Sequence, residues 1–188
     1  MSYLLFLVFF CGVLVIVLAG LYFTSFYSSL LGAPFVPIEK KYLREILSLG
    51  EIKENDIFCD FGCGDGRVLI EAVKNFNVKR AFGFEISPFP YLLSKWNVKR
   101  NKYQDKISVQ RQNFFDISPE FLSKIDVLYI YLFPEVVDKL EKKVFPYLKK
   151  GTKIIAPSFY LKKDNKDFNI VNVKKIGWHT VYVYEKVR

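Results

Sequence analysis

Hydrophobic positions divide the chain into an apolar N-terminal stretch and a longer part with mixed patterning. No Lys, Arg, Asp or Glu occurs from residue 1 to residue 38, and residues 3–23 read YLLFLVFFCGVLVIVLAGLYF. A helix of about 21 such residues, rising ~1.5 Å each, is ~31 Å long, which is enough to cross the hydrocarbon core of a bilayer. The pattern therefore predicts one N-terminal transmembrane helix.

Two other interpretations of this stretch are a cleaved signal peptide and a buried core helix. A signal peptide begins with basic residues and has a shorter apolar core, whereas this run is long and follows no basic residue. We favour a membrane anchor over residues 1–32, with membrane lipid as its partner. The first charges, from Glu39 to Arg44, follow the span and are mostly basic. The positive-inside rule then predicts a single-pass membrane protein with a cytoplasmic catalytic domain.

After the apolar stretch, the hydrophobic period alternates between that of helices and that of strands. Helices are expected over 38–50 (with Gly50 as C-cap), 66–76, 87–101 and 134–148, and strands over 56–61, 80–86, 106–112, 125–133 and 152–159. Strands separated by single helices indicate an α/β fold, in which helices cover both faces of a parallel sheet. Strand-like runs at 168–176 and 179–187 predict a C-terminal β-hairpin. We assign residues 33–188 to one domain.

A glycine-rich stretch lies between the first expected strand and the helix after it. Residues 60–66 read DFGCGDG, with Gly62, Gly64 and Gly66 at alternate positions. Glycine permits unusual backbone angles and close approach to a ligand, and this junction is where open α/β sheets bind ligands. Glu85 ends the second strand, where a carboxylate can accept both hydroxyls of a ribose. A structural turn is the alternative, but the combination favours a nucleotide-type cofactor.

The spacing of DFGCGDG differs from the G-x-G-x-x-G fingerprint of dinucleotide sites. From about residue 39 to residue 158 the chain instead resembles the class I S-adenosylmethionine-dependent methyltransferases, whose first motif is an acid followed by glycines at alternate positions. The resemblance implies a Rossmann-like sheet and S-adenosylmethionine as the cofactor. It also implies that the glycine loop lies under the methionine part of the cofactor near Asp60, and that Glu85 holds the ribose.

The same resemblance implies that QNFFD, after the third strand, faces the adenine through Asn113 and Phe114. The family often has Gly-Asp where Gln112-Asn113 stands in this chain. The side-chain oxygen of Asn113 can still accept a hydrogen bond from the adenine amino group, but it carries no negative charge.

A narrower resemblance rests on APFVPIEKKYLREIL before the glycine loop, YLFPEVVDKLEKKV after the fourth strand, and HTVYVYE near the end. Together with the apolar span, these segments are similar to the membrane-anchored protein-lysine methyltransferases that modify the c-ring protein of ATP synthase and the adenine nucleotide translocase. This implies a protein substrate embedded in a membrane. It also implies that PFVP, with Phe35 and Pro37, covers the cofactor and substrate. A stiff linker leaving the membrane is the alternative.

Methyl transfer to lysine requires that the amine first lose its proton, because its ordinary pKa is ~10.4. The sequence does not identify the responsible group, so the catalytic residue is unassigned. Tyr131 and Phe133, at the end of the fourth strand, are candidates for a rim around the amine, with core packing as the alternative. The segment after this strand is YLFP rather than an NPPY-like or DPPY-like motif, which disfavours methylation of amide or base nitrogens.

The chain carries a net charge of +9, with 28 basic and 19 acidic residues. Basic clusters at 99–102 and 149–153 suit RNA, anionic lipid or plain solvent, and nucleic acid is the least favoured of these partners because the span ties the domain to a membrane. Cys59 and Cys63 lack the further ligands of a structural zinc site, since the chain has three cysteines and one histidine. We therefore expect no metal and small buried thiols.

These observations predict a membrane-anchored S-adenosylmethionine-dependent methyltransferase that acts on a lysine of a protein. A methyltransferase of RNA or of a small molecule is the alternative enzyme. A non-catalytic cofactor-binding module at the membrane is the alternative outside enzymology, although the intact glycine loop and Glu85 argue against it.

Overall fold

The computed structural model describes residues 2–30, 36–161 and 165–188 and contains a seven-stranded sheet. The strands follow the order β3-β2-β1-β4-β5-β7-β6. Their bounds are β1 Ile57–Phe61, β2 Arg80–Phe84, β3 Ile107–Gln110, β4 Val127–Ile130, β5 Lys153–Pro157, β6 Phe168–Ile176 and β7 His179–Lys186. β1 to β5 are parallel, and the β6–β7 hairpin joins β5 in antiparallel fashion. The predicted α/β class, Rossmann-like sheet and C-terminal hairpin are confirmed.

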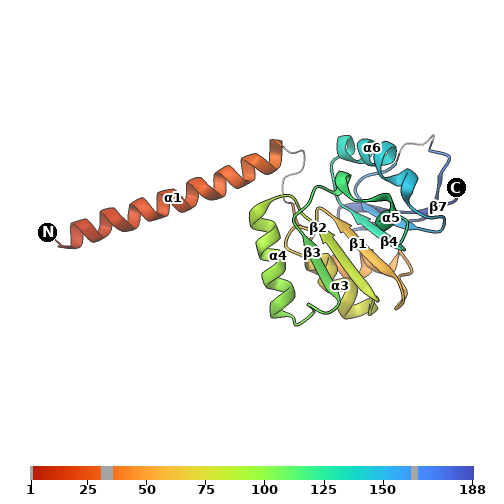
Figure 1. Cartoon of the computed structure of the whole chain (residues 1–188), viewed down its shortest axis with the longest axis horizontal. Coiled ribbons are helices and arrows are strands. Elements are labelled where there is room, and N and C mark those ends of the chain that lie inside the picture. Colours follow the sequence, from red (N-terminus) through yellow and green to blue (C-terminus); the bar gives the residue numbers. More distant parts are fainter. Residues whose placement is uncertain (1, 31–35, 162–164) are drawn as a thin grey trace.

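Helices cover both faces of the sheet (Figure 1). Their bounds are α1 Ser2–Leu30, α2 Lys40–Ser48, α3 Arg67–Phe76, α4 Pro88–Arg100, α5 Pro119–Leu122 and α6 Pro134–Lys143, with 3-10 turns η1 Phe114–Asp116 and η2 Phe145–Tyr147. One hydrophobic core contains buried residues of α2, α3 and α4, and the other contains those of α5 and α6. In α2, α3 and α6, the spacing of the apolar residues thus fixes which side of the helix is buried.

Two expected element boundaries are wrong. Gly50 is not the C-cap of α2, because that position is taken by Leu49 in a right-handed helical conformation. Gly50 is instead needed for close packing, since a Cβ there would lie 2.5 Å from Ile155 Cδ1. The helix expected to reach residue 148 ends at Lys143, and a separate 3-10 turn contains Pro146, which has no N–H to donate to a helix.

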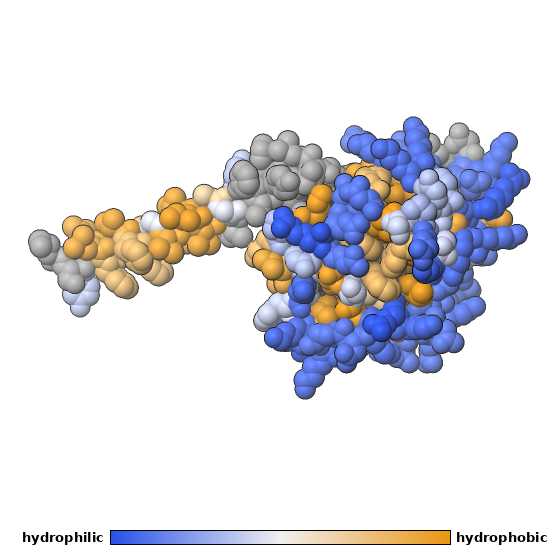
Figure 2. Space-filling model, viewed as in Figure 1, coloured by the Kyte–Doolittle hydropathy of each residue, from blue (hydrophilic) through white to orange (hydrophobic). Residues whose placement is uncertain are grey.

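Helix α1 projects away from the domain and has a hydrophobic surface (Figures 1 and 2). Its window Tyr3–Gly20 has a mean hydropathy of 2.8, and none of that window is buried. By length and composition, this helix can cross a membrane. Since the domain buries none of this window, α1 is not a helix of the domain core. An exposed apolar surface of this size is typical of a membrane or protein contact.

Candidate active site

A cavity of about 180 Å³ opens at the carboxyl ends of β1, β2 and β4. The loop after each of these strands contributes to its wall, as the loop after β3 does. Of the residues predicted from the sequence, those that line it are Pro37, Asp60, Gly62, Gly64, Glu85, Asn113, Phe114 and Tyr131. Parallel strands bring these positions to one edge because their carboxyl ends coincide.

Two other predicted residues are not part of this wall, and a third lies outside the described residues. Gly66 is the N-cap of α3 and packs against α4, where a Cβ would lie 3.2 Å from Ser94 Cβ. Phe133 is the N-cap of α6 and is 43% exposed. Phe35 is the residue outside the described ranges. The absence of a side chain at Gly66 therefore lets the start of α3 pack closely on α4, and Gly66 does not line the cavity.

The glycine loop turns sharply where β1 ends. Gly62 and Gly64 have φ angles of 76° and 54°, in the left-handed region that favours glycine. The backbone N–H groups of Gly62 and Cys63 both donate to the carbonyl oxygen of Phe84, at 2.9 and 3.1 Å. This shared acceptor ties the loop to the end of β2, so that the two walls of the cavity form one unit.

Glu85 is buried directly after β2, with 8% of its surface exposed. Its Oε2 accepts from the Gly64 backbone N–H at 3.0 Å, and its Oε1 accepts from the Ser87 N–H at 2.8 Å. Each carboxylate oxygen has capacity for a further hydrogen bond. Two backbone donors thus fix the carboxylate in an orientation from which it can accept a pair of neighbouring hydroxyls.

Asp60 and Tyr129 are both 2% exposed and lie side by side, in register, on the neighbouring parallel strands β1 and β4. Burial, together with the charges of Glu85 and Asp65, raises the pKa of Asp60 well above its ordinary value. Burial and the charge of Asp60 likewise raise the pKa of Tyr129 well above its ordinary value.

The Tyr129 hydroxyl has no hydrogen-bond partner within the described residues, although Tyr129 lines the cavity. A buried polar atom without a partner is costly, so it indicates a bound polar group that completes the site. Asp60 and Tyr129 together suit the polar methionine end of S-adenosylmethionine, and the buried Glu85 suits its ribose. The residues present therefore fit the expected cofactor.

On the β3 side, an aromatic surface lines the cavity. Phe114 stacks on Phe61 with ring centroids 5.3 Å apart and an interplanar angle of 10°. Asn113 caps the turn η1, because its Oδ1 accepts from the Phe115 N–H at 3.1 Å. The oxygen that was expected to meet the adenine is thus partly engaged, and one lone pair stays available.

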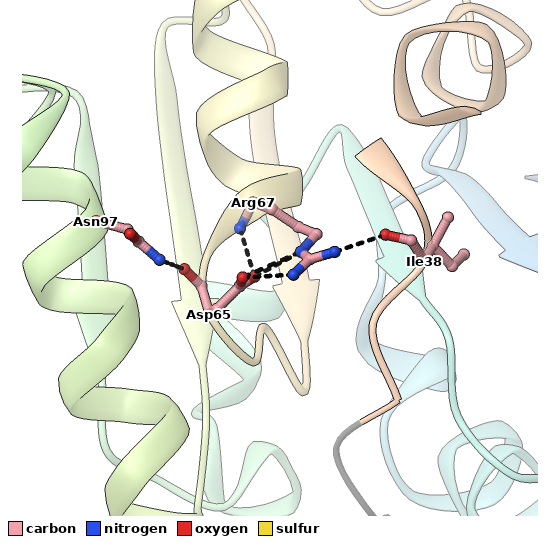
Figure 3. A network of polar contacts seen from close by, with 4 residues as sticks. All are labelled: Ile38, Asp65, Arg67 and Asn97. Carbon is pink, nitrogen blue, oxygen red and sulfur yellow. Dashed lines mark hydrogen bonds and ion pairs between the residues drawn. The ribbon is translucent and has the colours of Figure 1, made fainter. Parts of the chain in front are cut away.

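Arg67 and Asp65 together connect three separate segments at the mouth of the cavity (Figure 3). Arg67 Nη2 lies 2.7 Å from Asp65 Oδ2, and Arg67 Nη1 donates to the Ile38 carbonyl at 2.9 Å. From α4, Asn97 Nδ2 donates to the Asp65 carbonyl at 2.9 Å. The network holds the chain before α2 against the glycine loop, so that Val36, Pro37 and Ile38 complete the cavity wall.

Tyr131 joins the cavity to a polar cluster at the hairpin. Its ring and the His179 ring form a T-shaped pair with centroids 5.6 Å apart and an interplanar angle of 87°. His179 Nδ1 lies 2.7 Å from Ser158 Oγ, and Ser158 has a φ of 67°, which is unusual for a residue other than glycine. Burial lowers the pKa of His179, and the nearby Glu39 opposes this shift. The histidine therefore favours its neutral form.

Sequence reasoning assigned no role to several polar lining residues: Asp65, Arg67, Tyr129, Glu135 and Lys139. Asp65 and Arg67 stand inside or next to the glycine motif, so that their charges were a visible signal. Tyr129 was not identifiable, because a tyrosine in such an apolar strand is expected to be part of the hydrophobic core. Glu135 and Lys139, four residues apart on α6, place one charge of each sign on the same helix face.

The two domain cysteines, Cys59 and Cys63, are buried and free. Burial raises the pKa of both thiols well above the ordinary value, which keeps them protonated. Among the described residues, no group of three or more His, Cys, Asp or Glu side chains gathers in a way that could hold a metal ion.

Comparison with known proteins identifies the family. Residues 60–184 match the ANTKMT methyltransferase domain. A protein-lysine N-methyltransferase of Saccharolobus islandicus is 33% identical over 152 residues, which are 80% of this chain and 92% of that protein. The Homo sapiens lysine N-methyltransferase of the ATP synthase c-ring protein is 24% identical over 81% of this chain, and the match spans only 61% of the human protein.

A solved structure supports the same assignment. An RNA methyltransferase from Salinibacter ruber, in complex with S-adenosyl-L-homocysteine, superposes with a TM-score of 0.74 at 26% identity. The match covers 81% of this chain and 95% of that one. Family match, sequence relatives and fold agree, and we conclude that this chain belongs to the ANTKMT methyltransferase family and is an S-adenosylmethionine-dependent methyltransferase.

Proposed function

We propose that this methyltransferase is a protein-lysine N-methyltransferase that works at a membrane, on a lysine of a membrane protein. One observation carries the proposal: the chain that follows the apolar helix α1 continues into Val36, Pro37 and Ile38, which line the cavity. A membrane anchor would thus hold the cavity close to the lipid. The names of the relatives from Saccharolobus islandicus and Homo sapiens support lysine as the target.

The proposed membrane anchor also implies a division of the chain into two parts. Residues 1–32 would form the anchor and juxtamembrane segment, and residues 33–188 the catalytic domain on the cytoplasmic side. The basic residues among the first charges after the span support this orientation. The chain should then resist carbonate extraction from membranes, and added protease should spare the catalytic domain in intact cells.

Different side chains of the cavity would contact different parts of the cofactor. Glu85 would accept the two ribose hydroxyls, with its orientation fixed by the N–H groups of Gly64 and Ser87. Asn113 and the Phe114 ring would face the adenine, and Asp60 would lie near the methionine ammonium. When bound, S-adenosylmethionine supplies a methyl group on a sulfonium that is already activated for transfer, so the protein mainly needs to position the acceptor.

The segment that contains Phe35 and Pro37 would cover the bound cofactor and exclude water. Pro37 lines the cavity, and the next residue, Ile38, accepts the hydrogen bond from Arg67. Proline restricts the conformations that the segment loses when it becomes ordered, which makes it a suitable cover.

The acceptor amine would enter past Tyr131, with Phe133 further out on the rim. Glu135 lines the cavity at the start of α6 and is exposed, so its carboxylate can attract a lysine ammonium from solvent. Before transfer the ammonium would have to give its proton to a base or to water, because its ordinary pKa is ~10.4. The neutral nitrogen then has a free lone pair for the methyl group.

The proposal is tested with membranes from a strain that lacks the protein. The purified full chain and radiolabelled S-adenosylmethionine are added, and the label is traced to a residue after acid hydrolysis. We expect label in methyl-lysine of a membrane protein, and loss of that label with the Glu85→Gln variant. Glu120→Gln, an exposed position on α5, is the matched control and should leave the label unchanged.

An RNA substrate is the second candidate, because the Salinibacter ruber neighbour is named an RNA methyltransferase. The same reaction decides between them when its RNA fraction is digested and analysed for methylated nucleosides. Label in RNA together with unlabelled protein would contradict the lysine proposal, and the assignment as a methyltransferase would stand.

A further inference from the structure

Helix α4 exposes hydrophobic side chains on the face that points away from the domain. Its buried face carries Pro90, Ser94 and Val98. On the outer face, the exposed fractions of three large side chains are 49%, 62% and 54% for Phe89, Leu92 and Trp96. The spacing i, i+3, i+7 places these three on one side of a helix. We call Phe89, Leu92 and Trp96 the α4 stripe.

Basic residues accompany the α4 stripe. Lys95, Lys99 and Arg100 are exposed on α4, Lys102 follows in the next turn, and α4 itself contains no acidic residue. Arg100 lies over the Trp96 ring, with its guanidinium carbon 4.6 Å from the ring centroid. In the described part of the chain, none of these four basic residues forms an ion pair with a carboxylate.

The other basic cluster of the domain differs in this respect. Lys149 pairs with Asp126 at 2.5 Å, and Lys153 pairs with Glu51 at 2.5 Å. Much of its charge is thus neutralised within the domain. The charge beside the α4 stripe stays available for an external anion.

The α4 stripe also lies at the right place relative to the anchor. Figure 1 shows α4 on the side of the domain from which α1 projects, and running across the direction of α1. Hydrophobic surface appears at that side of the domain, next to hydrophilic surface (Figure 2). If α1 crosses a bilayer, α4 therefore faces the bilayer surface.

We infer that the α4 stripe docks on an anionic lipid surface, with Phe89, Leu92 and Trp96 entering the headgroup region. Lys95, Lys99, Arg100 and Lys102 would contact the lipid phosphates. Trp with neighbouring basic residues is the composition that favours a membrane–water interface. The inference rests on the membrane anchoring proposed above, and it concerns a contact of the catalytic domain itself.

Docking of this kind would orient the active site. The first turn of α4 follows Ser87, which lines the cavity. Val36, on the segment between α1 and α2, lines the same cavity. Two attachments, α1 and α4, hold a body more rigidly than one tether does. The cavity rim would then stay at the height of lysines just outside the bilayer.

The two tryptophans of the chain provide the test, because Trp96 is in the stripe and Trp178 is 76% exposed in the turn between β6 and β7. The Trp178→Phe variant leaves Trp96 as the reporter, and Trp96→Phe leaves Trp178. Each full-length variant is reconstituted into phosphatidylcholine vesicles with or without phosphatidylglycerol, and bromine on the upper acyl chain serves as quencher. We expect severalfold stronger quenching and a blue shift for Trp96 only, increased by phosphatidylglycerol.

A matched pair of variants tests the stripe directly in the Trp178→Phe background. Leu92→Glu and Ile170→Glu each place a carboxylate at an apolar position that is 62% or 58% exposed. Leu92→Glu should abolish the quenching of Trp96, and Ile170→Glu, on the edge strand β6, should preserve it.

Flotation of the vesicles reports on α1 separately. A chain that floats while Trp96 stays unquenched would overturn the docking and leave the anchor intact. A chain that does not float would overturn both. A blue shift of Trp96 that depends on protein concentration in lipid-free detergent would assign the stripe to a second copy and overturn the lipid proposal.

Discussion

Arg67 Nη1 donates a hydrogen bond to the backbone carbonyl of Ile38, 2.9 Å away. The two residues belong to different parts of the site, since Arg67 begins the helix after the glycine loop and Ile38 lies in the segment before α2. The bond therefore links the proposed cover to the proposed cofactor loop, and the remaining donors of Arg67 hold Asp65.

Replacing Arg67 by Lys should weaken S-adenosylmethionine binding about 10- to 150-fold, which corresponds to the ~1.5–3 kcal/mol of a hydrogen bond to a charged group. Lysine keeps the charge but cannot bridge a carboxylate and a carbonyl with a planar fork. Calorimetric titration measures the effect. Arg80→Lys is the control. Arg80 donates the same kind of bond, to the Asp105 carbonyl at 2.8 Å, but it lies at the amino end of β2, away from the cavity. Equal affinities in both variants would refute the link.

Glu85→Gln should lower the affinity for S-adenosylmethionine by about tenfold or more, because an amide NH₂ would face the N–H of Gly64 or of Ser87 and leave a donor unpaired. Glu85→Asp keeps the charge and shortens the reach, so its loss should also be large. Equilibrium dialysis with labelled cofactor provides the measurement. Unchanged binding by both variants would remove Glu85 from the proposed site.

His179 should make the free energy of unfolding depend on pH. Burial lowers the pKa of the folded histidine, so the unfolded chain binds more protons once the pH falls below its ordinary value near 6.5. The contribution of His179 to stability is then fully present above about pH 6.5 and is lost as the pH falls through the lowered pKa. Urea unfolding at a series of pH values should show a smaller acid loss for His179→Gln than for the wild type. Parallel curves would contradict the assignment.

Lys186 should be important for stability even though it is charged. Lys186 is only 4% exposed, and its Nζ donates to the carbonyls of Phe145 at 2.6 Å and Pro146 at 2.9 Å. Lys186→Met leaves both carbonyls unpaired and should cost about 1–3 kcal/mol in the free energy of unfolding. Lys175→Met, on the exposed side of β6, should change it by less than about 0.5 kcal/mol. Denaturant titration of the two variants compares them, and similar values would show that the buried ammonium is dispensable.

Much of the architecture could be predicted from local patterns. The apolar N-terminal run, the alternation of strand and helix periods, and the glycines after β1 are properties of neighbouring residues, so they are visible in the sequence. The same holds for Glu85, because the position after the second strand has a fixed relation to the glycine loop in such sheets. The boundaries at Gly50 and residue 148 failed because a packing contact and a proline within a helix-like pattern decided them.

Tertiary structure alone decided which distant side chains meet. Sheet register puts the Tyr129 phenol beside Asp60, and no periodicity marks a phenol in an apolar strand as part of a cavity. The contacts of Arg67 with Ile38 and of Tyr131 with His179 join segments that are separated by 29 and 48 positions in the chain. Helix α4 is apolar on two sides, so its pattern indicates a helix without saying which side is covered. The folded domain buries one side against the sheet and leaves the α4 stripe exposed, because the hydrophobic effect specifies how much apolar surface is buried and the packing geometry specifies where.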